Sequence, residues 1–511
     1  MTNAVRSLTH RIRSLRPASD SGLAFILFVI GVASRIPFLS RQLYHWDSVN
    51  FALAMEHFDV RLHQPHPPGY LLYVVLGQFV NAFVHDPNTS LVWISALFGG
   101  LTVGVVYLLG RRLFGRTEGI IGALFALTMP AFWFYSEVAL TYIVEACCVT
   151  AIALACLESL RGNSRAPYYS AILLGLAGGI RQTTLVLMLP LWLFSLRRIG
   201  WRSRFISFGL LVLTCVAWFT PTVVLSGGLA AYLEASRAIG GDVLSSLELF
   251  KGGASLLDPF ARLGMYVLYG LMAGLVAMLY GVVKIARRIR VTLRQWWPDD
   301  RFHVMALWLI PNLVLYAPLV RAPGHTFSFM PALLILAAAA LVVASRDVAG
   351  RFALSASRLV AGLTSLVLAI NLVFFLAAPP YLFGIRRVIT TTTSWPTIQY
   401  RDQYLAERTA YITQHFDPAT TLILTSGSDY RHPDYYLRNY ATLNYDGEPL
   451  TRSAPNGSQV LVFFSEGLTS DLGQVQKAIL PNGDSLLYLN LSANSEISVD
   501  GSNVSVQSQV Q

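Results

Sequence analysis

The sequence has very little charge and almost no lysine. Only 13% of its 511 residues are Asp, Glu, Lys or Arg, whereas 54% are hydrophobic, and the mean hydropathy is +0.51. This balance excludes an ordinary soluble protein and indicates a membrane protein. The formal charge of +10 comes almost entirely from arginine, because lysine occurs only at Lys251, Lys284 and Lys477. We expect this basic surplus to lie beside a membrane, and we predict no nucleic acid partner.

Cysteine is rare, and a phosphate-binding loop is missing. The four cysteines, Cys147, Cys148, Cys156 and Cys215, lie within apolar runs, so we expect small core residues and no disulfide framework. The pattern G-x-x-x-x-G-K-[ST] occurs nowhere, and we therefore do not expect ATP-driven transport by this chain alone. No small-residue cleavage site follows the first apolar run, which we interpret as a retained helix.

The chain does have many apolar runs of roughly 17 to 25 residues, the length that crosses about 30 Å of hydrocarbon. The runs at 168–180 and 185–196 are short and can also be interpreted as one broken hairpin around 181–184. In total we predict about eleven spans, near residues 22–38, 91–110, 117–135, 138–158, 168–180, 185–196, 206–226, 262–286, 303–320, 327–345 and 359–379.

The distribution of arginine predicts the orientation of these spans, since short basic loops prefer the cytoplasmic side. The tail 1–21 is basic and is therefore predicted to be cytoplasmic, followed by a transmembrane region 22–379 whose first exterior loop is 39–90. If the apolar stretch 69–84 also spanned, every later basic loop would face outward. We therefore predict that 69–84 lies along the outer interface or re-enters the membrane.

The first exterior loop carries the strongest signs of chemistry. Asp47 follows the first span, and the amphipathic stretch 49–58 is predicted to be a helix on the membrane surface. The aromatic residues Tyr44, Trp46 and Tyr70 lie nearby, where they can bind a substrate. An alternative interpretation is that the aromatic residues form an ordinary interfacial belt and that Asp47 caps a helix beginning at Ser48 or Val49.

Two histidines of this loop, His63 and His66, are spaced three apart. Without a third ligand they do not predict a metal site, so we expect no cofactor, although the pair leaves a divalent metal possible.

An acid after the first span, followed about twenty residues later by His66-Pro67-Pro68 and an apolar helix, resembles the GT-C class of integral membrane glycosyltransferases. The sequence is most similar to the polyprenyl-phosphate-sugar transferases, which include the protein O-mannosyltransferases and the lipid A aminoarabinose transferases. The resemblance covers about residues 20–345. Its later landmarks are Tyr135-Ser136-Glu137, the turn GGIRQ at 178–182 and the segment RAPGHTFSFMP at 321–331.

The resemblance implies a helical bundle that moves a sugar from a polyprenyl phosphate to an acceptor on the exterior face. Asp47 matches the first-loop acid, which acts as a base or orients the acceptor. Ser48 stands where the mannosyltransferase pattern has a second acid, which argues against protein mannosylation. Glu137 and Glu145 both lie near the expected position of another family acid, and they remain alternatives.

Such a transfer places negative charge on the departing phosphate, so the site needs cationic or hydrogen-bonding groups there. Arginine binds phosphate through a planar fork. An arginine at the end of a span can also simply reach toward lipid headgroups. The candidates for the donor phosphate are His66, Arg181, Arg321 and His325.

The last part of the chain is more polar and predicts a small exterior α/β domain at 380–491. We predict helices near 403–415 and 468–479, strands near 420–425, 459–464 and 485–490, and a disordered tail at 492–511. The segment 429–440 is dense in tyrosine and arginine, which suits either sugar stacking or packing within a loop.

Together these features predict an all-α polytopic membrane protein with a small exterior α/β C-terminal domain. We expect a plasma-membrane glycosyltransferase whose partners are a polyprenyl-phosphate-sugar donor, membrane lipid and an unidentified acceptor. The alternative is a secondary transporter or flippase of a lipid-linked or small polar substrate. A transporter should show related halves and polar helices that converge near the bilayer midplane.

Overall fold

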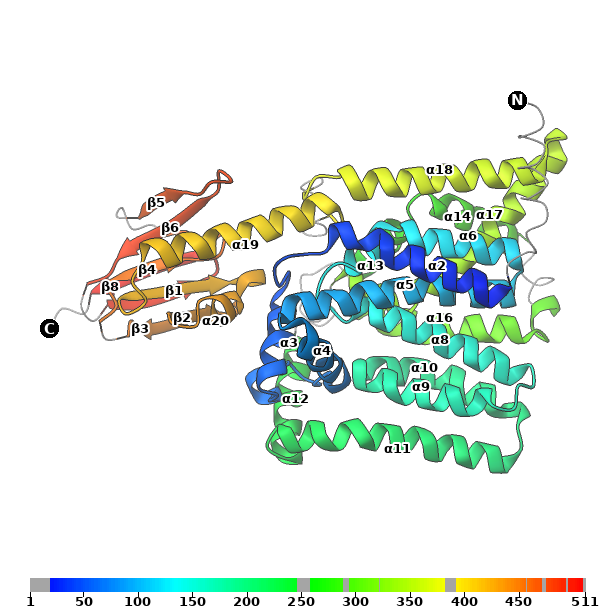
Figure 1. Ribbon diagram of the computed structural model, residues 1–511, viewed down its shortest axis with the longest axis horizontal. Coiled ribbons are helices and arrows are strands. Elements are labelled where there is room, and N and C mark those ends of the chain that lie inside the picture. The colour runs from blue at the N-terminus through cyan, green and yellow to red at the C-terminus, as the bar shows by residue number, and fades with distance from the viewer. Residues whose placement is uncertain are drawn as a thin grey trace.

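The computed structural model describes residues 19–245, 258–287, 294–320, 322–381, 392–455, 457–470, 475–492 and 495–508. Figure 1 shows a bundle of roughly parallel helices with a smaller α/β domain attached at one end. The bundle consists of α2 (Asp20–Arg35), η1 (Ile36–Phe38), α3 (Trp46–Glu56), η2 (Val60–Leu62), α4 (Leu71–Val84), α5 (Pro87–Leu113), α6 (Arg116–Thr128), α7 (Pro130–Tyr135), α8 (Tyr142–Leu160), α9 (Ala166–Ile180), α10 (Gln182–Ser195), η3 (Leu196–Arg198), α11 (Trp201–Leu225), α12 (Leu229–Ser245), α13 (Asp258–Leu271), α14 (Gly274–Ala286), α16 (Asp300–Leu319), η4 (Pro323–Ser328), α17 (Met330–Phe352) and α18 (Ala356–Ala377).

Every predicted span overlaps at least one helix, but the helices differ in length. Within the described residues, seven helices are long and apolar enough to cross a membrane, and α13 with α14 makes an eighth if the pair, bent by 115°, counts as one span. The two short runs form separate helices, α9 and α10, that pack side by side and meet at Arg181, as in the hairpin interpretation. The predicted span 117–135 is broken between α6 and α7 at Pro130, where proline interrupts helical hydrogen bonding.

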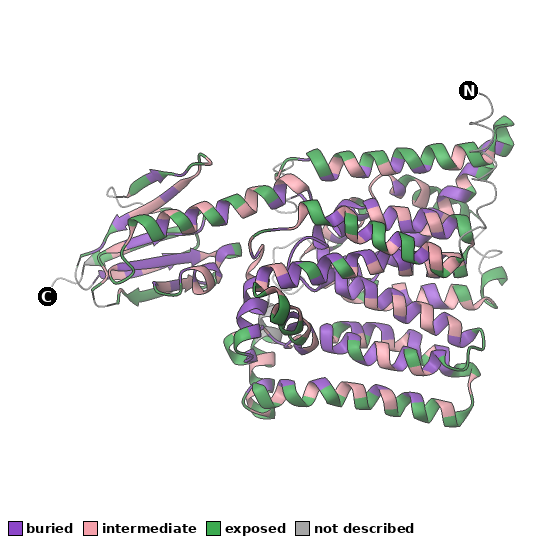
Figure 2. Cartoon of the chain, in the orientation of Figure 1, coloured by how far each residue is buried: buried purple, intermediate pink, exposed green. Residues whose placement is uncertain are grey.

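Burial follows the position of each helix in the bundle. In the most apolar 18-residue stretch of each helix, 67% of α5 and 72% of α8 is buried. In α2, α11 and α18 only 17–22% of this stretch is buried. Figure 2 shows exposed residues along the outer helices α11 and α18. Apolar side chains on such outward faces are suited to contact with lipid tails.

The basic loops gather at one end of the bundle, where ion pairs connect neighbouring helix ends. Arg112 lies 3.2 Å from Glu158, Arg198 lies 2.5 Å from Asp300, and Lys284 lies 2.5 Å from Asp347. The C-terminal domain, α3, α4 and α12 lie at the opposite end (Figure 1). The structure thus separates the basic loops from the first exterior loop, and the assignment of the basic end to the cytoplasm stays a prediction.

The C-terminal domain has two β-sheets. It contains α19 (Trp395–His415), β1 (Thr421–Ser426), η5 (Gly427–Asp429), α20 (His432–Tyr436), β2 (Ala441–Tyr445), β3 (Leu450–Ser453), β4 (Val460–Phe463), β5 (Gln476–Ile479), β6 (Ser485–Asn490), β7 (Ser495–Asp500) and β8 (Asn503–Ser508). The larger sheet has the order β2-β1-β4-β6-β5, with β1 parallel to both β2 and β4, and the smaller sheet is β3-β7-β8.

The larger sheet lies between two covering layers. On one side Leu405 and Ile412 of α19 pack with Ile423 and Val462. On the other side Ile497 and other apolar residues of the smaller sheet pack with buried leucines of β1 and β4. This domain and the helical bundle confirm the predicted fold class.

Two predictions for the C-terminal domain are wrong. The helix predicted at 468–479 is not formed over Gln476–Ile479, which is strand β5 paired with β6. The tail 492–511, predicted to be disordered, contains strands β7 and β8. Its apolar residues alternate along these strands and are buried at Ile497, Val499 and Val504, and this period of two outweighs the polar composition.

Close packing of glycine joins the first two long helices. A Cβ atom on Gly100 of α5 would lie 2.6 Å from Cγ2 of Val32 and 2.7 Å from the carbonyl oxygen of Phe28, both on α2. Small residues at such contacts allow membrane helices to approach each other closely. α2 leads directly into the first exterior loop, so this contact helps to fix where that loop begins.

We predict that Gly100→Ala lowers stability by about 1–3 kcal/mol, because the added methyl group overpacks the contact between α2 and α5. Thermal unfolding in detergent measures the effect. Gly209→Ala is the matched control, because a Cβ at Gly209 of α11 meets no atom within 4 Å. Equal melting temperatures for the two variants would contradict this account of the packing.

Candidate functional site

Asp47 lies in the wall of a cavity of about 480 Å³ between the bundle and the C-terminal domain. It belongs to the first turn of α3, but it does not cap this helix. His45 does so, because its Nδ1 accepts a hydrogen bond from the backbone N–H of Asp47 at 3.2 Å. The interpretation of Asp47 as a helix cap is therefore wrong, and its carboxylate is available for other contacts.

Two histidines face this carboxylate. Oδ1 of Asp47 lies 3.3 Å from Nδ1 of His66, and Oδ2 lies 3.5 Å from Nδ1 of His45. The other ring nitrogen of His66 lies 3.1 Å from the hydroxyl of Tyr70, which fixes the orientation of the imidazole. Trp46 packs against His66 with ring centroids 5.5 Å apart.

The surroundings of Asp47 favour the ionised carboxylate. Burial raises the pKa of Asp47, but His66, His45 and Arg181 outweigh burial and bring this pKa down to about 2. Burial lowers the pKa of His66 below its ordinary value. At neutral pH the site therefore contains an ionised carboxylate beside a neutral imidazole.

Arg181 and Glu145 form a buried ion pair next to this group. Nε of Arg181 lies 3.0 Å from Oε2 of Glu145, whose other oxygen accepts a hydrogen bond from Thr184 at 2.7 Å. The guanidinium also donates to Thr141 at 3.1 Å and lies over the ring of Tyr142 at 4.7 Å. Arg181 is thus held behind Tyr142, which lines the cavity.

The turn between α9 and α10 explains why the Arg181 side chain reaches Glu145 and Tyr142. Arg181 has extended backbone angles between the two helices, so its side chain leaves the helical path. An added Cβ on Gly179 would lie 2.5 Å from Cδ1 of Leu72, so the absence of a side chain lets α4 pack directly against the end of α9. This packing brings Tyr70 within 5.9 Å of the Arg181 guanidinium.

Of the two alternative acids, Glu145 belongs to this cluster and Glu137 does not. Glu137 is fully buried, and the charge of Arg35 acts on it. Arg35 is itself buried and lies over the ring of Trp133 at 5.0 Å. The carbonyl oxygen of Glu137 accepts a hydrogen bond from the backbone N–H of Ser40 at 2.9 Å, so Glu137 anchors the start of the first loop.

Of the remaining predicted residues, Tyr44 lines the cavity, and His325 lies beside the lining residue Tyr142. Tyr44 packs edge-on against Phe134 at 5.1 Å. His325 of η4 lies between Tyr142 and Tyr316, with ring centroids 5.9 and 5.5 Å away. Arg321 lies outside the described residues. Within the described residues, no group of three or more His, Cys, Asp or Glu side chains could hold a metal ion.

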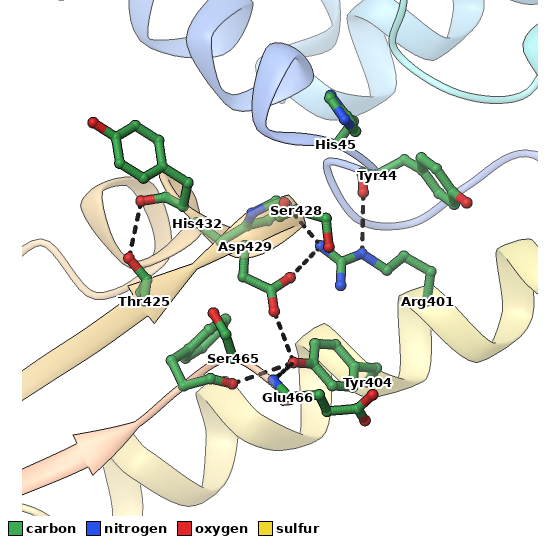
Figure 3. A network of polar contacts seen from close by, with 12 residues as sticks. Tyr44, His45, Arg401, Tyr404, Thr425, Ser428, Asp429, His432, Ser465 and Glu466 are labelled. Carbon is green, nitrogen blue, oxygen red and sulfur yellow. Dashed lines mark hydrogen bonds and ion pairs between the residues drawn. The ribbon is translucent and has the colours of Figure 1, made fainter. Parts of the chain in front are cut away.

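The opposite wall of the cavity comes from the C-terminal domain, and the sequence did not predict it. This wall includes Tyr400, Arg401 and Tyr404 of α19, the loop after β1, and Glu466. Figure 3 shows Arg401 between Tyr44 and Asp429, with Tyr404 hydrogen-bonded to the same aspartate. The density of tyrosine in α19 was the available signal, but tyrosine alone does not distinguish a cavity wall from a packed core.

The same domain holds the chain segment that leads to Asp47. Asp402 accepts hydrogen bonds from the Ser40 hydroxyl at 2.7 Å and from the backbone N–H groups of Arg41 and Gln42 at 2.8 and 3.0 Å. Arg401 donates to the carbonyl oxygen of Tyr44 at 3.1 Å and forms an ion pair with Asp429 at 2.5 Å. Residues 40–44 are therefore fixed from outside the bundle.

Two side chains of α20 complete this contact at Leu43. The hydroxyl of Tyr436 accepts a hydrogen bond from the backbone N–H of Leu43 at 2.8 Å, and Nε2 of His432 donates to its carbonyl oxygen at 2.7 Å. His432 and Tyr436 of the segment 429–440 thus pack at the junction between the C-terminal domain and the bundle. This agrees with the interpretation of that segment as packing residues. Nearby, Arg438 forms a bidentate ion pair with Glu56 at 2.7 and 2.6 Å.

Known proteins share sequence features and the fold of this chain. Residues 65–225 match a family model described as dolichyl-phosphate-mannose-protein mannosyltransferase. The fold is similar to that of ArnT from Cupriavidus metallidurans, in the apo state with 14% identity and bound to undecaprenyl phosphate with 12% identity. Both matches have a TM-score of 0.52 and cover 91% of this chain and 97% of ArnT.

A further similar structure is the apo oligosaccharyltransferase of Archaeoglobus fulgidus, with 14% identity, a TM-score of 0.48, and coverage of 84% of this chain and 65% of that one. The search of curated proteins found no match. The likeness to ArnT confirms the expected GT-C fold.

We predict that acidification weakens the domain junction through His432. Burial lowers the pKa of His432 to about 3. The unfolded chain takes up a proton near pH 6.5 and the folded protein does not, so stability is lost as the pH falls from about 6.5 toward 3, by about 2 kcal/mol at pH 5. His432→Gln keeps an N–H donor for Leu43 and removes this titration.

Thermal unfolding in detergent at pH 7 and pH 5 measures the effect. The melting temperature of His432→Gln should fall less than that of the wild type. The exposed His415 provides the control, because His415→Gln should behave like the wild type. If His432→Gln lost as much stability as the wild type, the assignment of this titration to His432 would be wrong.

Proposed function

We propose that the protein is a membrane glycosyltransferase that moves a sugar from a polyprenyl-phosphate-linked donor to a hydroxyl group of an acceptor. The observation that carries this proposal is the Asp47 carboxylate in the wall of the cavity, 3.3 Å from Nδ1 of His66 and close enough to Arg181 for its charge to act on the carboxylate. The match of residues 65–225 to a mannosyltransferase family model and the ArnT structure with bound undecaprenyl phosphate support the lipid-linked donor.

Asp47 is the general base of this proposed reaction. The acceptor oxygen attacks the anomeric carbon of the donor sugar, and the bond from that carbon to the phosphate oxygen breaks. The phosphate keeps the electron pair and leaves as polyprenyl phosphate, while the acceptor proton passes to the Asp47 carboxylate. Because positive charge develops on the sugar, a nearby carboxylate also stabilises the transition state.

Glu145 has a positioning role in this proposal. Both of its oxygens are engaged, by Arg181 and by Thr184, and its side chain is fully buried. It therefore fixes the guanidinium rather than accepting a proton from the substrate. Arg181, His66 and His325 remain our candidates for contact with the donor phosphate, and Arg321 remains a candidate from its position in the sequence.

The location and the sugar are further parts of the proposal. We place the protein in the plasma membrane, with the basic loops toward the cytoplasm and the C-terminal domain outside, because short basic loops are retained inside. The transferred sugar is a hexose or a pentose. The charged groups around Asp47 cluster at one end of the bundle, whereas a secondary transporter concentrates its polar groups near the midplane. This placement favours the glycosyltransferase over the transporter alternative.

We predict that Asp47→Asn lowers sugar transfer by about 10²- to 10⁴-fold, because the amide cannot take the acceptor proton. The measurement is transfer from a panel of radiolabelled polyprenyl-phosphate sugars by purified protein in liposomes. Asp347→Asn at the basic end is the control, and it should retain wild-type transfer. Wild-type turnover that survives in a folded Asp47→Asn protein would refute the assigned base.

We predict that Asp402→Ala lowers kcat by about 10- to 100-fold, because it releases the segment before Asp47 and small displacements of a catalytic group are costly. The wild-type, Asp402→Ala and Glu496→Ala proteins should be compared in the same transfer assay. Glu496 lies on β7, away from the junction, and its replacement should leave kcat unchanged. An unchanged kcat in Asp402→Ala would contradict the positioning role of the C-terminal domain.

A further inference from the structure

The parallel part of the larger sheet presents its strand ends to the Asp47 cavity. β1 is parallel to β2 on one side and to β4 on the other. Residues that end these strands or follow them, Ser426, Tyr445 and Glu466, line cavities at this edge. In α/β sheets, ligands commonly bind outside the carboxyl ends of parallel strands.

Two cavities adjoin along this edge. The cavity of about 480 Å³ contains Asp47, and a second one of about 290 Å³ lies farther out on the C-terminal domain. Both are lined by Ser426, Gly427 and Glu466, and the second continues to Ser502. We call this second cavity the strand-end groove. It extends the space around Asp47 along the C-terminal domain.

Bare glycine backbone forms much of the strand-end groove. Gly427, Gly447, Gly467 and Gly501 all have positive φ, between +57° and +107°, and a Cβ built on any of them would meet no atom within 4 Å. A ligand can therefore approach the main chain closely along the groove. The turn at Gly501 is held in place, because its backbone N–H donates to the Tyr445 hydroxyl at 2.9 Å.

The side chains around this path suit carbohydrate. Tyr381 and Tyr400 line the inner cavity with ring centroids 6.0 Å apart, and Asp446 and Glu466 line the groove. Tyrosine offers a flat apolar face with a polar end, and a carboxylate accepts hydrogen bonds from sugar hydroxyl groups. In the structure, Glu466 accepts a hydrogen bond from the hydroxyl group of Tyr400 at 3.0 Å.

The charges along the path do not favour a strongly anionic ligand. Asp446 contributes negative charge to the groove, Glu466 is paired with Arg408 at 3.5 Å, and the arginine among the cavity residues, Arg401, is engaged by Asp429. A chain of phosphate or carboxylate groups would meet Asp446 here and find the two nearby arginines, Arg401 and Arg408, already paired with carboxylates, which disfavours its binding.

We propose that the acceptor is a neutral glycan chain, which places its reacting hydroxyl at Asp47 and its following sugars in the strand-end groove. This inference rests on the proposed function, because it assigns the acceptor of the same site. The C-terminal domain then has two roles. It fixes residues 40–44, and it binds the sugars of the acceptor that follow the reacting one.

The test is binding of neutral hexose oligosaccharides of increasing length to the full-length protein in detergent, without donor. The probes are a series of neutral glucans and mannans, with sulfated and carboxylated oligosaccharides and hydroxyl-containing peptides for comparison. We expect binding of neutral chains that strengthens with length beyond one sugar. Preferential binding of the anionic oligosaccharides or of the peptides, or no binding of any neutral chain, would overturn the proposal.

Variants locate the binding site. Ser502→Trp fills the outer groove and should weaken binding of the long neutral chain at least tenfold, whereas Ser505→Trp on the exposed part of β8 should leave it unchanged. Glu466→Gln is a milder variant that keeps the side-chain shape and should weaken binding several-fold. Wild-type affinity in both groove variants would overturn the assignment of the groove.

The same experiment separates the two proposals. Binding of neutral chains that depends on the groove but is accompanied by no sugar transfer from any donor would refute the proposed function and leave the glycan site standing. Sugar transfer to an acceptor at the wild-type rate in Ser502→Trp and Glu466→Gln would refute the glycan site and leave the transferase standing.

Discussion

The contact between the C-terminal domain and residues 40–44 is the constraint on which the site depends. These residues connect α2 to α3 and end immediately before His45 and Asp47. A loop at the end of a membrane helix has few neighbours of its own, and a catalytic group needs supporting contacts that fix it within a fraction of an ångström. Here Asp402, His432 and Tyr436 bind the loop backbone, so a domain far away in the sequence fixes the position of the carboxylate.

Charge compensation is the second condition of the site. A carboxylate as enclosed as Asp47 would be neutral without favourable neighbours, because burial disfavours the charged form. His66, His45 and Arg181 lower the pKa of Asp47 despite this burial, and at neutral pH, where His66 is neutral, the positive charge that remains is that of Arg181. Glu145 in turn keeps Arg181 in place by a buried ion pair. The groups thus depend on one another, because the ion pair between Arg181 and Glu145 stabilises the negative charge of Asp47 in the first loop.

The sequence predicted what depends on composition and local pattern. Apolar runs gave the helices, arginine gave the separation of the basic loops, and the position of Asp47 after the first span gave the candidate base. It did not predict the partner of Arg181 or the cavity wall around Arg401 and Glu466, because these contacts join residues that are distant along the chain. The last two strands, β7 and β8, were predicted to be disordered for another reason. The many serine and asparagine residues in 492–508 indicated disorder, whereas the alternating apolar residues Ile497, Val499 and Val504 are buried.

The most direct test of the account is a cryo-electron microscopy structure of the protein in lipid nanodiscs with an undecaprenyl-phosphate ligand. The account predicts that the phosphate lies at the end of the bundle that carries Asp47, within hydrogen-bonding distance of Arg181, His66 or His325, and that the lipid chain runs along the outer faces of the helices. A phosphate bound among the arginine loops at the opposite end, with the Asp47 cavity empty, would contradict it.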